Sequence, residues 1–288
     1  MSTLVTPVLS LEDLRPAFRQ RLKSMYSGEL QPGNNGPVEL DKLTRISEPQ
    51  GMWIYETCRR LKPKGSLEIG LAYGFSTIYI LAAIDQTRAG HHTALDPFQR
   101  SYWHGVGALQ AKHFDMERSF EMLEEFSVTA LASFATQKRE FEFIYIDGNH
   151  RFDDALVDFT LAADVCPMGG HIVFDDTWMP SIQTVASWIR LDRRISAKFR
   201  RRSEILSSSS ESGKMIEGGT ISFRSVRPLH RTGLGSEPPF PDASSGASNA
   251  CWILSCSETD VFESDRSWMG ETGNKRGFLG ASSPRAMP

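Results

Sequence analysis

Short apolar segments alternate with helical patterns between residues 45 and 190. The predicted strands are residues 66–70, 93–96, 120–123, 141–147 and 171–174, and the predicted helices are residues 47–61, 75–85, 105–114, 128–134, 151–166 and 181–191. Strands that alternate with helices along the chain pair in parallel, and the helices cover the sheet. The alternation therefore predicts an α/β fold with a doubly wound, mostly parallel sheet and helices on both faces.

Residues 67–76 carry the pattern E-x-G-x-x-x-G-x-S between a predicted strand and a predicted helix. Gly70 and Gly74 allow a sharp turn and the close approach of a ligand. The first N–H groups of the helix would face an anionic group. The G-x-G-x-x-G spacing of dinucleotide sites is missing, which disfavours a nicotinamide dehydrogenase. A strand, glycine turn and helix also occur as a purely structural unit, so both interpretations stay open.

Acidic residues stand at the ends of three predicted strands. Asp96 ends strand 93–96, where a doubly wound sheet binds ligands and an acid can accept hydrogen bonds from ribose hydroxyls. Asp147 ends strand 141–147, and Asp175 and Asp176 follow strand 171–174. Oxygen ligands from two neighbouring loops suit Mg²⁺. The alternative is that Asp147, Asp175 and Asp176 only cap turns.

His150 lies three residues after Asp147. An imidazole titrates near neutral pH and can accept a proton from a substrate hydroxyl. A role in orienting the following helix is an equal alternative. Aromatic and sulfur-containing side chains near the strand ends would wall an acceptor pocket, or belong to the core: Tyr73, Trp103, Trp178 and Met179.

The ends of the chain differ from its middle. Residues 1–38 form an N-terminal extension with a helix at 11–25, interpreted as a lid, a dimerisation arm or a frayed end. Residues 39–227 form the expected domain, which ends in a weak hairpin of residues 195–205 and 220–226. Residues 228–288 are rich in Ser, Gly and Pro and are expected to be mostly disordered.

Composition excludes several classes of protein. The net charge of −3 gives no electrostatic reason to expect nucleic acid as a partner. No apolar stretch reaches the length of a membrane span. Four cysteines without a C-x-x-C pair disfavour zinc and a disulfide framework. We expect a soluble, cytoplasmic protein with a small-molecule partner; a homo-oligomer stays an open alternative.

Four motifs occur in the order and spacing of class I S-adenosylmethionine-dependent methyltransferases: residues 67–76, 96–98, 145–150 and 174–177. Over roughly residues 40–226 the chain resembles the small-molecule O-methyltransferase-like branch that includes macrocin-type antibiotic sugar methyltransferases. The resemblance implies a Rossmann-like sheet of seven strands. It also implies that S-adenosylmethionine is the cofactor and a small-molecule hydroxyl the acceptor.

The resemblance assigns roles to individual residues. The implied cofactor contacts are Glu68, Gly70, Tyr73, Gly74 and Ser76, then Asp96 at the ribose, Glu125, Phe126 and Ser127 beside the adenine, and Asp147. Metal-dependent relatives bind Mg²⁺ through positions that match Asp147, Asp175 and Asp176. Asp147 or His150 would be the catalytic base. Because residues 200–219 depart from the family pattern, a cofactor-binding protein without catalytic activity is the alternative.

Overall fold

The computed structural model describes residues 9–191, 220–226 and 251–257. Five parallel strands form the centre of one sheet, in the order β5-β4-β3-β6-β7. Their bounds are β3 Gly65–Ile69, β4 His91–Leu95, β5 Phe120–Leu123, β6 Phe143–Ile146 and β7 His171–Phe174. The order runs outward from β3 in both directions, so the chain switches direction between β3 and β6, where a ligand crevice is expected. The predicted α/β class is confirmed.

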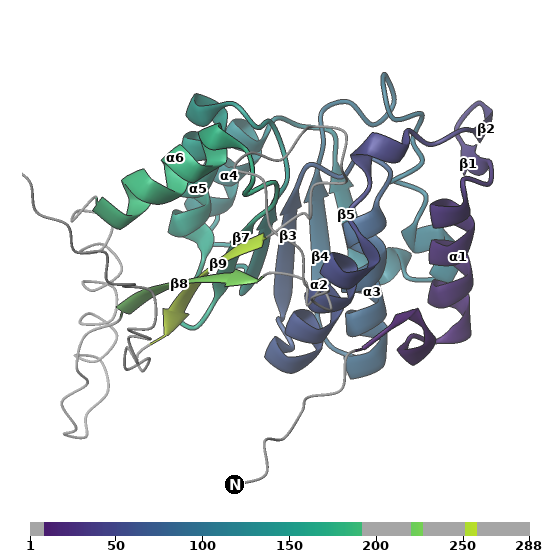
Figure 1. The fold of residues 1–288 in the computed structure, drawn as a ribbon, viewed down its shortest axis with the longest axis horizontal. Helices are drawn as coiled ribbons and strands as arrows, with labels where there is room; N and C mark the ends of the chain where they lie inside the picture. Colours follow the sequence, from purple (N-terminus) through teal and green to yellow (C-terminus); the bar gives the residue numbers. More distant parts are fainter. Residues whose placement is uncertain (1–8, 192–219, 227–250, 258–288) are drawn as a thin grey trace, which may run out of the picture.

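Helices cover both faces of this sheet (Figure 1). One layer holds α1 (Pro16–Ser27), α2 (Glu48–Leu61) and α3 (Phe75–Thr87), and the other holds α4 (Ser127–Thr136), α5 (Phe152–Val165) and α6 (Pro180–Leu191). Both faces are apolar, as strand β6 illustrates, because its successive side chains alternate between the two faces. Phe143 and Tyr145 pack in the first layer, and Ile144 and Ile146 pack in the second.

Two antiparallel strands continue the sheet beyond β7. Strand β9 (Cys251–Ser257) pairs with β7 on one side and with β8 (Thr220–Val226) on the other. Residues 195–205, the predicted partner of residues 220–226, lie outside the described residues; the described partner of β8 is β9. The apolar run Trp252, Ile253 and Leu254 suits a strand with a neighbour on each side. These seven residues lie within residues 228–288, which are expected to be mostly disordered; the other residues of that segment lie outside the described residues.

Residues 105–114 do not form the predicted helix. They form turns and a short 3-10 helix, η3 (Ala111–Phe114), which is followed by a second one, η4 (Glu117–Ser119). Gly105 has φ +73, a value outside the helical region. A Cβ at Gly107 would lie 2.4 Å from the carbonyl oxygen of Ala72, so this glycine lets the segment pack tightly on the loop after β3. Two glycines in ten residues also weaken any helix.

The N-terminal segment packs on the first helical layer. Its helical pattern is split by Pro16, so a 3-10 helix, η1 (Leu11–Asp13), precedes α1. Phe18, Leu22 and Met25 of α1 are buried, as their spacing predicted. A hairpin of β1 (Gln31–Gly33) and β2 (Gly36–Val38) and the 3-10 helix η2 (Lys42–Thr44) lead to α2. Among the described helices, none combines the length and apolar character that a membrane span requires.

Candidate functional site

The loop after β3, residues 70–74, contains two glycines with left-handed backbone conformation and is called the glycine loop below. Gly70 has φ +90, and a Cβ there would lie 2.0 Å from the carbonyl oxygen of Asp147. Glycine is therefore required for the loops after β3 and β6 to lie against each other at the switch point of the sheet. The loop ends at Gly74, the N-cap residue of α3, with φ +80.

We expect Gly70→Ala to lower the free energy of unfolding by about 2–4 kcal/mol, because it combines left-handed backbone strain with a steric overlap. Urea unfolding measures the change. Gly169→Ala is the matched control: Gly169 has φ +85 but nothing within 4 Å of the added Cβ. Its cost should be limited to about 1 kcal/mol of backbone strain. Equal costs at the two positions would contradict the close contact.

Glu68 lies beneath this loop, inside the protein. Its side chain is fully buried, and its two carboxylate oxygens accept hydrogen bonds from the hydroxyls of Ser76 and Thr77 at the start of α3. His92 Nε2 lies 3.4 Å from the same carboxylate. Glu68 and Ser76 thus join β3 to α3, and neither lines the cavity described below.

Asp96, at the end of β4, holds the glycine loop from the other side. Its Oδ2 accepts hydrogen bonds from the backbone N–H groups of Leu71 and Ala72, at 3.2 and 2.8 Å, and from the Gln99 side chain at 3.1 Å. Its Oδ1 accepts one hydrogen bond, from Phe98 N at 2.8 Å. Asp96 therefore shapes the loop and keeps acceptor capacity on Oδ1 for a ligand.

A cavity of about 580 Å³ opens at the carboxyl ends of β3, β4 and β6, beside the first turns of α4 and α5. Five of the predicted site residues line it: Gly70, Asp96, Phe126, Ser127 and Asp147. The cavity lining also includes Ala72 and Trp103, from the glycine loop and the segment after β4. Predicted residues outside the lining are Glu68, Tyr73, Gly74, Ser76, Glu125, His150, Asp175 and Asp176.

The cavity lining combines negative charge with apolar surface. Among the described residues, its ionisable side chains are four carboxylates, without a Lys, Arg or His: Asp96, Asp147, Asp154 and Asp158. Its exposed apolar side chains are Phe98, Phe126, Val128 and Val157. Such a lining repels a pyrophosphate and suits a ligand with a flat apolar part and a positive charge.

Asp158 was not predicted as a site residue. It is 4% exposed, and it lies among the buried apolar positions of α5, which include Ala155 and Phe159. Its Oδ1 accepts a 2.5 Å hydrogen bond from the hydroxyl of Ser127. Burial raises the pKa of the Asp158 carboxyl from 3.8 to about 6. A carboxylate on the core stripe of an amphipathic helix is the sequence signal that could have identified it.

The raised pKa of Asp158 makes a prediction about stability. The folded protein binds this proton more tightly than the unfolded chain does. The contribution of Asp158 to the free energy of unfolding is therefore fully present below pH 4 and is lost as pH rises through 6. Asp158→Asn does not titrate and keeps an acceptor for Ser127. We expect its stability relative to the wild type to rise by roughly 2–3 kcal/mol between pH 4 and 7.5. Urea unfolding across this range measures it; a constant difference would refute it.

Asp147, His150 and Asp176 converge beyond the ends of β6 and β7, and one ligand atom of each lies within 4.8 Å of the other two. His150 Nε2 is 2.8 Å from Asp176 Oδ2 and 3.5 Å from Asp147 Oδ1. Nevertheless Nε2 is buried and has no partner in hydrogen-bond geometry among the described residues. The carboxylates of Asp147 and Asp176 raise the pKa of the imidazole to about 10. The three side chains therefore face a common point.

Asp175, predicted as a metal ligand, is not part of this cluster. It is 3% exposed and accepts hydrogen bonds from the Tyr145 hydroxyl at 2.5 Å, from the Gln50 side chain and from the backbone N of Asp176 at 2.7 Å. Burial and the charge of Asp176 raise its pKa to about 6. Asp176 itself adopts a left-handed φ of +48, which turns its side chain toward His150, and Trp178 Nε1 donates to it at 2.8 Å.

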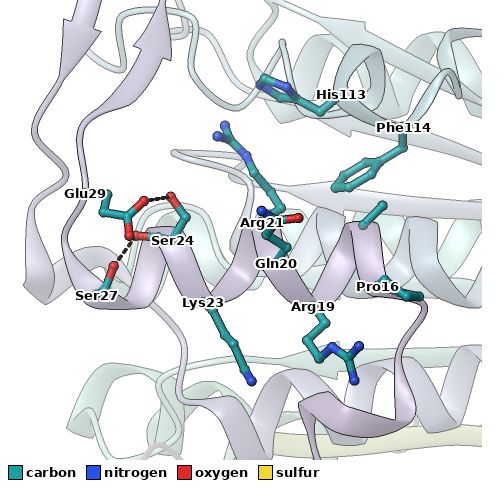
Figure 2. Close-up of a pocket in the computed structure, with 11 residues that line it drawn as sticks. Pro16, Arg19, Gln20, Arg21, Lys23, Ser24, Ser27, Glu29, His113 and Phe114 are labelled. Carbon is teal, nitrogen blue, oxygen red and sulfur yellow. Dashed lines mark hydrogen bonds between the residues drawn. The ribbon is translucent and has the colours of Figure 1, made fainter.

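A larger cavity, of about 750 Å³, lies between α1 and η3 (Figure 2). Its lining contains Arg19, Arg21, Lys23 and His113, and none of the predicted site residues. It lies away from the strand ends, and its cationic side chains disfavour a cationic ligand. The smaller, acid-lined cavity is therefore the candidate site.

The glycine loop is nevertheless tied to α1. Arg21 Nε donates to Gln110 Oε1 at 3.0 Å, and Gln110 Nε2 donates to the carbonyl oxygen of Tyr73 at 2.9 Å. Tyr73 is buried and packs edge-on against Trp103, with 5.1 Å between ring centroids. The N-terminal segment thus helps to position the loop, and Tyr73 acts from behind the cavity wall.

Comparison with known proteins agrees with this geometry. Residues 67–177 match the family model of a methyltransferase domain. No curated protein matches the sequence.

Solved structures share the fold at low sequence identity. An O-methyltransferase from Bacillus cereus, in complex with SAH, superposes with a TM-score of 0.51 at 15% identity, over 88% of this chain and 93% of its own. The O-methyltransferase TomG from Streptomyces achromogenes, involved in tomaymycin synthesis and in complex with SAM, has a TM-score of 0.51 at 16% identity, over 84% of this chain and 90% of its own. These likenesses establish the fold.

Proposed function

We propose that the methyltransferase domain of this chain, residues 67–177, binds S-adenosylmethionine in the acid-lined cavity and transfers its methyl group to a hydroxyl of a small molecule. The observation that carries the proposal is the lining itself, which within the described part of the chain has four carboxylates and no cationic side chain. The two O-methyltransferases of the same fold were crystallised with SAM or SAH, which supports the choice of cofactor.

The lining fits the parts of this cofactor. Its sulfonium and ammonium groups are positive and suit a cavity rich in carboxylates. Asp96 retains acceptor capacity for ribose hydroxyls. Phe126 and Val128, exposed on either side of Ser127, offer an apolar slot for the purine. Methionine would lie beside Gly70 and the loop after β3.

The reaction needs positioning and a proton acceptor. The carbon–sulfur bond breaks with its electron pair staying on sulfur, and the methyl group forms a bond to the acceptor oxygen, which loses its proton. Asp147 lines the cavity, and burial together with the charge of Asp175 raises its pKa, which makes the carboxylate a stronger base. Without a bound cation, the carboxylates of Asp147 and Asp176 raise the pKa of His150 to about 10, so its imidazole is protonated at neutral pH and does not accept a proton. A bound cation would displace that proton. We therefore assign the base to Asp147.

We also propose that Asp147, His150 and Asp176 hold a divalent cation. The buried His150 Nε2 has no hydrogen-bond partner among the described residues and lies close to the carboxylates of Asp147 and Asp176. This is the arrangement expected of three side chains that bind one cation. A bound cation would polarise the acceptor hydroxyl and lower its pKa. An imidazole among the ligands favours Mn²⁺ over Mg²⁺.

Calorimetry with MnCl₂ on the cofactor-free protein tests this assignment. We expect His150→Ala to weaken Mn²⁺ binding by at least about 10-fold, because one of three protein ligands is lost. The control is His104→Asn, at an exposed histidine outside the cluster, which should bind like the wild type. Undiminished binding by His150→Ala would remove the imidazole from the ligand set.

The cofactor assignment is tested by calorimetry with S-adenosylhomocysteine and, separately, with NAD. We expect saturable binding of the first and none of the second. Binding of NAD alone would replace the methyltransferase proposal by a dehydrogenase. Methyl transfer to a panel of phenols, sugars and polyketides would then identify the acceptor class and place the chain within or outside the macrocin-type branch.

A further inference from the structure

Arg21 of α1 is partly buried, and its hydrogen bonds to described residues go only to neutral groups. Its Nε and Nη1 donate to the side-chain oxygens of Gln110 and Gln31, which are both buried. Its Nη2 is buried and has no hydrogen-bond partner among the described residues. Burial lowers the pKa of the guanidinium to about 10. A cation held in this way is costly, and an anion close to it would stabilise it.

Arg21 lines the cavity of about 750 Å³ between α1 and η3, together with His113. Figure 2 shows Arg21 extending from α1 toward the side where His113 lies, whereas Arg19 and Lys23 extend the opposite way. Arg19 and Lys23 also line the cavity, but they form ion pairs with Glu12 at 2.6 and 2.5 Å. Because these two charges are already paired, an anion in the cavity is attracted chiefly by Arg21 and His113.

His113 is an exposed side chain of η3 in positive surroundings. Partial burial, followed by the charges of Arg21 and Lys112, lowers the pKa of its imidazole. Among the described residues of the lining, Glu29 is the one carboxylate, and its Oε2 accepts a hydrogen bond from Ser24 Oγ at 2.7 Å. An anion between Arg21 and His113 would therefore offset the repulsion between them and favour the protonated imidazole.

The size and chemistry of the lining indicate which anion fits. A volume of about 750 Å³ lies in the range of small-molecule sites, and a bare inorganic anion fills only a small part of it. Pro16, Ala17 and Phe114 add apolar surface beside the cationic side chains. An arginine and a histidine together suit the several acceptor oxygens of a phosphate group. The lining therefore fits a ligand with a phosphate group and a small organic part.

We propose that the cavity between α1 and η3 binds a phosphate monoester of a small organic molecule, with the phosphate between Arg21 and His113. The hydrogen bonds from Arg21 to Gln110 and Gln31 hold the guanidinium in place before the ligand arrives. Among the described residues, this cavity shares no lining residue with the acid-lined cavity, so the inference does not depend on the proposed function.

Calorimetry with phenyl phosphate near neutral pH tests the proposal on the full chain. We expect saturable binding by the wild type, and we expect Arg21→Met to weaken it by at least about 10-fold, because a charged partner of the phosphate is lost. Arg19→Met is the matched control: it removes the same charge from the same helix and the same cavity, but Arg19 is paired with Glu12. It should bind within about 3-fold of the wild type, since an exposed ion pair contributes little.

Absence of saturable binding by the wild type would overturn the proposal, and so would an equal loss of affinity in the two variants. Inorganic phosphate, titrated in parallel, tests the organic part of the ligand. We expect it to bind at least about 10-fold more weakly than phenyl phosphate, because it buries no apolar surface. Equal affinities would overturn the assignment to an ester.

A second measurement keeps Arg21 in place. The imidazole signals of His113 are followed by NMR across pH, with and without saturating phenyl phosphate, and the spectrum of His113→Asn identifies them. We expect the bound phosphate to raise the pKa of His113, because an anion stabilises the imidazolium. The pKa of His104, an exposed histidine outside the lining, should stay the same. An unchanged pKa of His113 with the probe bound would overturn the placement of the phosphate.

Discussion

Asp147→Asn is expected to lower kcat for methyl transfer by about 10³-fold, because a general base contributes 10²–10⁴-fold and the amide cannot accept the proton. Asp147 is the one carboxylate that both lines the cavity and belongs to the cluster with His150 and Asp176. The measurement is a single-turnover assay with labelled S-adenosylmethionine and an acceptor from the panel. Affinity for S-adenosylhomocysteine is measured in parallel, because Asp147 also lines the cofactor cavity.

Asp153→Asn serves as the control for Asp147→Asn, since Asp153 lies outside both the cavity lining and the cluster. It should retain the wild-type rate. Turnover by Asp147→Asn within about 10-fold of the wild type would mean that another group takes the proton.

Val157→Arg is expected to weaken S-adenosylhomocysteine binding by at least about 100-fold, because the arginine fills the cavity and pairs with its carboxylates. Val157 is 43% exposed on α5 and lines the cavity, so the larger side chain requires no space in the core. Calorimetry measures the loss, and thermal unfolding checks that the fold is kept.

Thr160→Arg is the matched control for Val157→Arg. It adds the same side chain to an exposed position of α5 outside the cavity lining. It should bind S-adenosylhomocysteine like the wild type. Equal affinity of both variants would place the cofactor outside the acid-lined cavity.

The central sheet was predictable because each of its strands reads as an apolar segment between helical patterns. Strand β9 was not, since its pairing with β7 and β8 joins segments far apart in the sequence. Composition around residues 251–257 gives no local signal for a long-range pairing. The loss of the predicted helix at 105–114 likewise depends on a tertiary contact, between Gly107 and the loop after β3.

The site was predictable where a residue ends a strand, and less so where the direction of its side chain decides its role. Asp175 follows Val173 by two residues and faces the same layer, where Tyr145 and Gln50 bind it. Asp176 instead leaves that layer because of its left-handed backbone. The side chain of Gln50, in the first turn of α2, supports Asp175, while Ser47 accepts from the Gln50 backbone N–H. The direction of these side chains depends on neighbouring residues that the local sequence does not specify.

A crystal structure of the protein with S-adenosylhomocysteine tests the central claim most directly. We predict the ligand in the acid-lined cavity, with its ribose at Asp96, its purine beside Phe126 and Val128, and its homocysteine part beside Gly70. Density for the ligand between α1 and η3, in the cavity lined by Arg21 and His113, would contradict it.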